Sequence, residues 1–296
     1  MPGELDLLRF PLAWAGVLVV LRLWRRRDPP LATVSDWLWC AGASVLFWDI
    51  FELVNLRLRD WWYTGVSPSF VWSGVFGTVS FATVLPAVRL MAGRPVLAPA
   101  QHRPLRLVLG LAMLALSLAF PRVAFPLAWI FLWPICEALA GARVPLRLAP
   151  LGLVLGLLWE SLNWQCPRGW IYTVPHFEHP KLFEMPLPGY LGYLPFMLEA
   201  LAALALVDRL RPRLNGALAL CGVLAVHFAV NLPARRVTDL SFAPYQASGV
   251  PEEALRLERR THMGIDRALA VQRRGWGALA DDPAVVRVWI EKADSR

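Results

Sequence analysis

Hydrophobic residues occur along this chain in long runs separated by short polar segments. A helix needs about 20 mostly apolar residues to cross a bilayer. Runs close to that length cover residues 5–24, 34–56, 70–91, 105–120, 123–141, 147–165, 187–207 and 214–232, the run at 105–120 being short. The pattern predicts an all-α polytopic membrane protein with about eight transmembrane helices.

A pattern of polar residues occurs twice within these runs. In each copy a Phe-Pro-Leu-Ala-Trp segment is followed downstream by an acid and an amide three residues apart, and then by Arg, Trp and Tyr. The first copy comprises Phe10–Trp14, Glu52, Asn55, Arg59, Trp61 and Tyr63, and the second comprises Phe125–Trp129, Glu160, Asn163, Arg168, Trp170 and Tyr172. The order is the same in both copies, which favours an internal duplication.

The duplication divides the predicted transmembrane domain, residues 1–233, into repeats of four helices at 1–120 and 121–233. A unit with an even number of helices repeats in the same orientation, so the two repeats should be related by an axis along the membrane normal. The two polar motifs would then face each other across a central cleft.

Composition supports a membrane protein and argues against a soluble domain. The chain is 57% hydrophobic, has a mean hydropathy of +0.46 and contains 15 Trp. Its formal net charge of +8 does not indicate nucleic-acid binding, because the Arg residues cluster in alternate loops. This is the positive-inside pattern. It places both polar motifs on the extracytoplasmic side of a bacterial inner membrane, although the basic C-terminal tail argues against that orientation.

Acidic residues inside apolar runs are the main candidates for chemistry. They are Asp49, Glu52, Glu137, Glu160 and Glu199. A charged side chain at the bilayer centre is costly, so such residues usually face a protein interior or a water-filled cavity. A desolvated carboxyl can serve as a general acid. The alternative is a structural role in polar pairs between helices, which we favour for Glu137.

The segment from Trp159 to Glu199 has the densest set of functional side chains. Its loop is rich in aromatic residues and proline, and we expect it to fold over the cleft as a lid, although Trp and Tyr also occur as ordinary interfacial residues. The catalytic candidates are Glu160, Glu184 and Glu199, with Asn163. The candidates for substrate binding are Glu52, Asn55, Arg168, Trp170, Tyr172, Tyr190 and Tyr193.

Histidines in the same loop offer a possible metal site. His176 and His179 could supply nitrogen ligands. However, His-x-Glu-His in a loop is not a helical His-Glu-x-x-His motif, and solvated histidines are the favoured interpretation. No metal or other cofactor is expected.

Residues 234–296 are more polar and are predicted to form a small soluble helical domain. Met263-Gly-Ile-Asp266 and Gly275-Trp-Gly-Ala-Leu-Ala280 resemble a degenerate helix-hairpin-helix module that lacks the usual Gly-x-Gly hairpin. About 60 residues form only a marginal core. This tail is therefore expected to dock on the membrane domain or on a protein partner, and nucleic acid is not expected as a partner.

In the segment from Trp159 to Glu199 an acid lies near a helix end, Trp-x-Tyr follows in the loop, and Gly, Pro and Glu open the next helix. This pattern resembles that of bacterial membrane-embedded lycopene cyclases and carotenoid hydratases. The resemblance covers about 40 residues in each half. It implies a cofactor-free reaction in which one carboxylic acid protonates a double bond and another acidic group steers the carbocation. Those enzymes have Pro-x-Glu-Glu, whereas this chain has Pro195-Phe-Met-Leu-Glu199.

Three functions therefore fit the sequence. The first is an intramembrane enzyme that acts on an isoprenoid or other lipid by carboxylate acid–base chemistry. The second is a proton- or cation-coupled transporter of small molecules. The third is a noncatalytic membrane scaffold. Membrane lipid is the expected partner in each case, and a lipophilic small molecule is the expected substrate of an enzyme.

Overall fold

The computed structural model describes residues 9–58, 60–64, 70–166, 169–172, 174 and 180–238. Arg168, His176 and His179 lie outside the described residues, as does the tail predicted to resemble a helix-hairpin-helix module from residue 239 onward.

The described part of the chain is mostly helical. Its α-helices are α1 (Arg9–Trp24), α2 (Val34–Leu58), α3 (Phe70–Phe81), α4 (Val84–Ala92), α5 (Arg103–Ala119), α6 (Pro121–Ala124), α7 (Leu132–Ala140), α8 (Pro150–Gln165), α9 (Tyr193–Leu210) and α10 (Gly216–Thr238). Its 3-10 helices are η2 (Phe125–Trp129), η3 (Leu146–Leu148), η4 (Leu187–Gly192) and η5 (Arg211–Arg213). Its short strands are β1 (Trp61–Thr64), β2 (Ala98–Pro99), β3 (Ala142–Arg143), β4 (Gly169–Tyr172), β5 (Lys181–Leu182) and β6 (Met185–Pro186).

Each predicted apolar run contains helix, but not every helix is long enough to span a bilayer. Within the described residues, four helical stretches are long and apolar enough to cross a membrane: Val34–Leu58, Gly74–Ala92, Pro121–Ala140 and Leu187–Arg213. By contrast α1 and α8 have 16 residues each, which at 1.5 Å per residue is shorter than a hydrocarbon core of about 30 Å. The membrane character of the chain is therefore supported, while eight spans and a four-plus-four repeat stay predictions.

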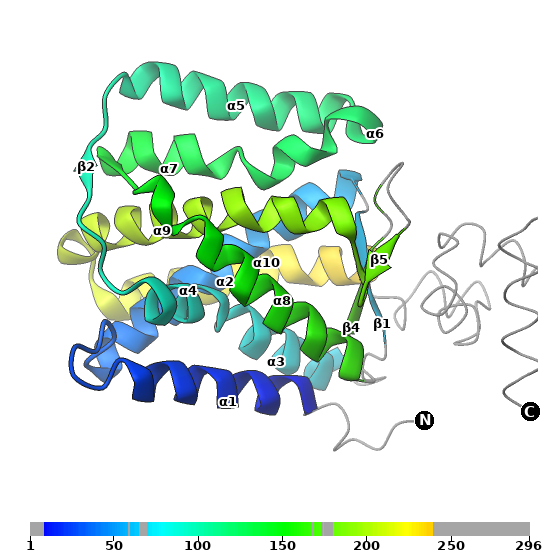
Figure 1. Cartoon of the computed structure of the whole chain (residues 1–296), viewed down its shortest axis with the longest axis horizontal. Helices are drawn as coiled ribbons and strands as arrows, with labels where there is room; N and C mark the ends of the chain where they lie inside the picture. Colours follow the sequence, from blue (N-terminus) through cyan, green and yellow to red (C-terminus); the bar gives the residue numbers. More distant parts are fainter. Residues whose placement is uncertain are drawn as a thin grey trace, which may run out of the picture.

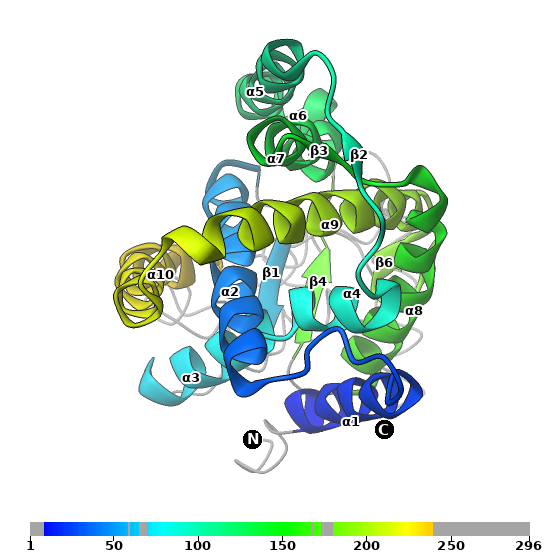
Figure 2. The same cartoon turned by 90° about the vertical axis from the view of Figure 1, so that its left-hand side faces the viewer.

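Helix α9 is the centre of the bundle. It is buried without interruption from Met197 to Ala205, and it packs against α7, α8, α4 and α2. Figure 2 shows α9 crossing the middle of the molecule, with α5 and α7 beyond it on one side and α1 on the other. Alanines in this stretch permit close approach on several faces, which is typical of packing between membrane helices.

The two ends of the bundle differ in chemistry. Strands β1 and β4 lie at one end, and the β2 segment lies at the other (Figure 1). At the β2 end arginines bind the carboxyl ends of helices: Arg25 donates to the carbonyls of Leu90 and Met91, and Arg209 to the carbonyl of Ala140. The last four carbonyls of a helix have no partner within it and carry partial negative charge, so guanidinium groups both satisfy and neutralise them.

Ion pairs reinforce this arginine-rich end. Arg106 pairs with Glu137, whose other carboxylate oxygen accepts the backbone N–H of Val144 at 2.8 Å. Arg89 pairs with Asp208 across α4 and α9. Glu137 therefore joins helices, which is the structural role that we favoured from the sequence.

Glycine allows α8 to lie directly against the start of α9. A Cβ placed on Gly152 would overlap the backbone carbonyl of Tyr193 and approach the Cβ of Met197 to 2.9 Å. Backbone cannot move aside as a flexible side chain can. The residue at this position therefore sets the distance between the two helices that carry Glu160 and Tyr193.

We expect Gly152→Ala to lower the free energy of unfolding by about 1–3 kcal/mol because it overpacks this contact. Gly16→Ala on α1 is the matched control, since a Cβ there meets nothing within 4 Å and alanine is the better helix former. Thermal unfolding of both variants in detergent is the measurement. Equal melting temperatures would contradict the close packing of α8 on α9.

Candidate functional site

The two copies of the acid–amide motif lie at the same end of the bundle. Helices α2 and α8 each carry one copy, and each helix leads into a strand, β1 and β4 respectively. These strands pair in antiparallel fashion, with Trp61 opposite Tyr172 and Tyr63 opposite Trp170. The tryptophan of each copy therefore lies across from the tyrosine of the other.

Both amides hold the strand that follows them. The side chain of Asn55 donates to the carbonyl of Trp61 at 2.9 Å and accepts the N–H of Asp60 at 2.8 Å. Asn163 does the same with the two backbone groups of Trp170, at 2.8 and 2.9 Å. Each amide is fully buried and thus satisfies backbone groups that the short strand leaves open. The structure places Asn55 and Asn163, a predicted binding and a predicted catalytic residue, in this backbone-holding role.

Both acids accept a hydrogen bond from the tyrosine of their own copy. Glu52 Oε1 accepts the hydroxyl of Tyr63 at 2.6 Å and the indole N–H of Trp48 at 2.9 Å. Glu160 Oε1 accepts the hydroxyls of Tyr172 at 2.8 Å and Tyr193 at 2.5 Å. Glu52 Oε1 also accepts the indole N–H of Trp61 at 3.3 Å, so the two copies share the acid–tyrosine contact and differ in the other donors.

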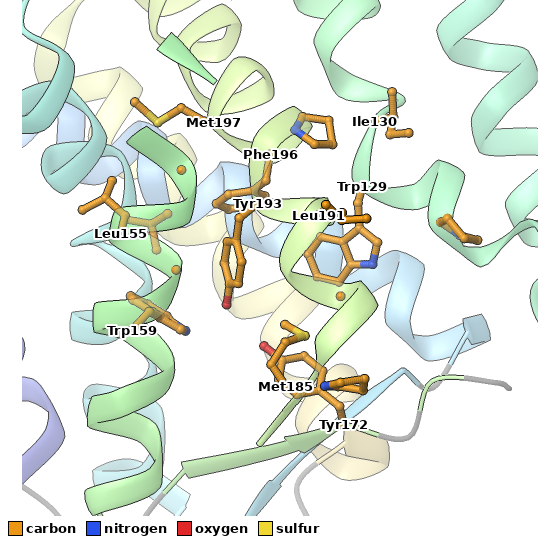
Figure 3. Close-up of a pocket in the computed structure, with 18 of the residues that line it drawn as sticks. Trp129, Ile130, Leu155, Trp159, Tyr172, Met185, Leu191, Tyr193, Phe196 and Met197 are labelled. Atoms are coloured by element: carbon orange, nitrogen blue, oxygen red, sulfur yellow. The ribbon is translucent and has the colours of Figure 1, made fainter. Parts of the chain in front are cut away.

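A cavity of about 320 Å³ is lined by the two tyrosines that bond to Glu160, while Glu160 itself lies behind this wall. Its wall is almost entirely apolar and includes Trp14, Trp48, Phe125, Trp129, Leu155, Trp159, Met185, Phe196 and Met197. Figure 3 shows Trp159 and Leu155 of α8 on one side, Trp129 on the other, and Tyr193 between them. Tyr172 and Tyr193 also line the cavity, and their hydroxyls are the groups bonded to Glu160.

The described part of the predicted lid covers this cavity. Met185 and Pro186 of β6, with Pro188 and Gly189 of η4, belong to its wall. The β5–β6 turn is held by Tyr190, whose hydroxyl donates to the carbonyl of Leu182 at 3.0 Å. Within that turn Glu184 is fully buried and close enough to Glu160 for the two carboxyls to interact electrostatically.

Glu199 lies at a different place. Its Oε1 accepts the backbone N–H of Leu132 at 2.8 Å, at the first residue of α7. A carboxylate at the amino end of a helix satisfies an open N–H and complements the positive end of the helix dipole. Glu199 is not part of the cavity wall described above.

The structure therefore brings together only some of the residues singled out in the sequence. Tyr172 and Tyr193 line the cavity, and Glu160 lies behind them, bonded to both hydroxyls, with Glu184 close to it. Trp170 donates its indole N–H to the hydroxyl of Tyr172 at 2.9 Å. Glu52 and Asn55 bond instead to residues of β1, and Glu52 also accepts the indole N–H of Trp48, which belongs to the cavity wall.

Sequence reasoning did not identify the tryptophans of the cavity wall. Trp14 and Trp129 end the two Phe-Pro-Leu-Ala-Trp segments, and both line the cavity. The repetition of this segment was the available signal, because it marked paired positions that contribute to the same wall from two places in the chain.

Among the described residues, no group of three or more His, Cys, Asp and Glu side chains is arranged to hold a metal ion. The cavity wall presents phenol and indole groups, and the carboxyl of Glu160 is bonded to two of the phenols.

No protein-family model, curated protein or solved structure matches the chain. The fold and site define a helical membrane protein with an apolar internal cavity and buried acids beside it.

Asn163→Ala should loosen β4, because it leaves the N–H and carbonyl of Trp170 without their partners. The expected loss is about 2–4 kcal/mol in the free energy of unfolding. Hydrogen exchange of residues 169–172 should accelerate, while exchange in α5, which lies far from the strand pair, should not change. Unaltered protection of β4 would contradict the backbone-holding role of Asn163.

Asp60 provides a test that depends on pH. It lies between α2 and β1, is fully buried, and its carboxylate oxygens have no hydrogen-bond partner among the described residues. Burial raises the pKa of Asp60 from 3.8 to about 7. The unfolded chain therefore releases this proton near pH 4 while the folded chain keeps it, so stability falls as pH rises from about 4 to 7 and then levels off.

We expect Asp60→Asn to remove this pH dependence and to stabilise the protein at pH 8 by up to roughly 4 kcal/mol, the equivalent of about three pKa units. Thermal unfolding at pH 5 and pH 8 measures the effect. If the variant is no more stable than the wild type at pH 8, other groups in the folded protein offset the buried charge of the Asp60 carboxylate.

Proposed function

We propose that the chain is an intramembrane enzyme that acts on an isoprenoid or another apolar lipid by carboxylate acid–base chemistry, with Glu160 as the general acid. The observation that carries the proposal is the position of Glu160. It lies one hydrogen bond behind the apolar wall of a cavity of about 320 Å³, because the two tyrosines to which it bonds both line that cavity. An apolar pocket with a few convergent polar groups is typical of a site for a lipophilic substrate.

Burial favours a neutral acid at Glu160, because an ionised carboxylate in an apolar surrounding is costly, and the hydrogen-bond directions locate its proton. An indole N–H only donates, so Tyr172 accepts from Trp170 and directs its own proton to Glu160. Oε1 of Glu160 thus receives two O–H donors, from Tyr172 and Tyr193. The proton of a neutral Glu160 then belongs on Oε2, which is buried and has no hydrogen-bond partner among the described residues.

The proposed step balances without a cofactor. Tyr193, at the cavity wall, gives its hydroxyl proton to one carbon of a double bond, and the π electrons form the new C–H bond, leaving a carbocation on the adjacent carbon. Glu160 returns a proton to the Tyr193 oxygen and is left as a carboxylate. Loss of a proton from a neighbouring carbon to a carboxylate then forms a new double bond. We assign this second role to Glu184, because its carboxyl interacts electrostatically with Glu160 and its negative charge would stabilise the cation.

The walls of the cavity suit such an intermediate. Trp129, Trp159 and Phe196 present aromatic faces and edges rather than nucleophilic groups. Aromatic faces attract cations, and an apolar wall excludes water that would otherwise add to the carbocation.

Orientation in a bacterial inner membrane forms part of the proposal. The arginines that bind helix ends lie at the β2 end, and both acid motifs lie at the β1–β4 end. The positive-inside rule would then place the arginine-rich end in the cytoplasm and the acids on the extracytoplasmic side.

The test compares wild type with Glu160→Gln in a bacterial host that accumulates linear isoprenoids such as lycopene. We expect a new lipid in the wild-type extract that is an isomer of the host isoprenoid, and a decrease of at least about 100-fold in the variant, the usual range for loss of a general acid. Mass spectrometry and absorbance of the lipid extract detect the product.

Ser161→Ala is the matched control, because Ser161 is the next residue on α8 and its hydroxyl bonds only to its own helix, at the carbonyl of Leu158. It should retain the product. An unchanged lipid profile in hosts making folded wild-type protein would contradict the enzyme and favour a transporter or a scaffold.

A further inference from the structure

A second buried network lies between α2, α3 and α10. Nδ1 of His227 lies 2.9 and 3.0 Å from the two carboxylate oxygens of Asp49, and its Nε2 lies 2.7 Å from the hydroxyl of Thr78. Asp49 and His227 are 2% and 1% exposed. Three helices that are distant in sequence thus contribute a carboxylate, an imidazole and a hydroxyl in a row.

This network is separate from the proposed site. None of its three residues belongs to the cavity wall, and Glu160 is not among their hydrogen-bond partners. Asp49 and Glu52 are three residues apart on α2, but Glu52 bonds to Tyr63 and Trp48 while Asp49 bonds to His227.

Thr78 allows the imidazole to be satisfied with either one or two protons. Its hydroxyl also lies 2.8 Å from the carbonyl of Gly74, one turn earlier on α3. When Nε2 carries a proton, it donates to Thr78, whose own hydrogen goes to Gly74. When Nε2 is bare, the hydroxyl rotates and donates to it. In both cases Nδ1–H donates to Asp49, so no ring nitrogen is left unpaired.

Charge distinguishes the two forms. With the second proton the pair is an imidazolium and a carboxylate with no net charge, and without it the carboxylate is a buried, uncompensated charge. Few other charges are near. Among the described side chains, α3 has no titratable residue, α2 contributes Glu52 one turn away, β1 contributes Tyr63, which is bonded to Glu52, and α10 contributes Cys221, which is exposed.

We propose that Asp49, His227 and Thr78 form an intramembrane proton-binding site, which holds α10 against α2 while the proton is bound. The proton is gained and lost at Nε2. The Thr78 hydroxyl is the adaptor, because it accepts a hydrogen bond from Nε2 in one state and donates one to it in the other. Many apolar side chains of α10, such as Leu218, Leu224 and Phe228, are exposed, while His227, Asn231 and Ala234 are buried. The bonds of His227 to Asp49 and Thr78 therefore contribute to fixing the rotation of α10 on α2.

Nitrogen NMR of the full chain, labelled on its five histidines, tests the proton. The signals of His227 are those lost in His227→Gln. We expect two ring N–H signals in the wild type while the proton is bound, and one in Asp49→Asn under the same conditions. Raising the pH of the wild type should then remove Nε2–H and leave Nδ1–H.

Three results would overturn the proton site. The first is a single N–H on wild-type His227 at every pH, the second is loss of Nδ1–H before Nε2–H, and the third is retention of both until the protein unfolds. Thr78→Val keeps the shape of the side chain but removes the adaptor. This variant should fold, and the pH at which His227 loses Nε2–H should differ from that of the wild type. Ser80→Ala on the same helix should leave that pH unchanged.

A cross-link tests the hold on α10. A Cβ placed on Gly42 of α2 would lie 3.8 Å from Val223 of α10, so cysteines at these two positions are within reach of a disulfide. Cys40 and Cys221, which lie nearby, are replaced by Ala. The rate of disulfide formation is divided by the rate in the same protein that also carries Asp49→Asn. This ratio cancels the pH dependence of thiol chemistry, which both proteins share.

This ratio should fall at least about threefold once Nε2 loses its proton, because the uncompensated carboxylate weakens the contact. A ratio that does not change across the pH range in which NMR detects proton loss would overturn the link between proton binding and α10.

Discussion

Polar groups in an apolar surrounding must find their partners within the chain, and this constraint accounts for most of the contacts in the structure. Asn55 and Asn163 satisfy the strands that follow α2 and α8, and arginines satisfy the ends of α4 and α7. The side chains that make the bundle compatible with a membrane are thus also those that fix its geometry. The cavity depends on this framework, because Tyr172 is held by the strand that Asn163 secures.

The two copies of the motif show how one framework can have two chemical outcomes. Around Glu52 the additional donors are the indoles of Trp48 and Trp61, and around Glu160 the additional donor is the hydroxyl of Tyr193. An indole N–H only donates, whereas a phenol can both donate and accept a proton. The carboxyl of the second copy is therefore bonded to two phenols, and that of the first to one phenol and two indoles.

The sequence was sufficient to predict the helices and the acid–tyrosine motif. The helices followed from long apolar runs, and Glu160 with Tyr172 followed from a repeated spacing. Other features depend on single residues that meet only in three dimensions. Asp49, Thr78 and His227 lie on separate helices, and the bond between Glu199 and α7 joins residues that are 67 positions apart. Apolar periodicity could not locate the turn at Ala82 and Thr83 between α3 and α4, because both sides are equally hydrophobic.

The register of β1 and β4 has a further consequence. Because Trp61 pairs with Tyr172 and Tyr63 with Trp170, the strand pair looks the same from either partner. A half-length chain with one such strand could form the same pair with a second copy of itself. The difference between Glu52 and Glu160 therefore lies in the side chains around the strand pair and not in its register.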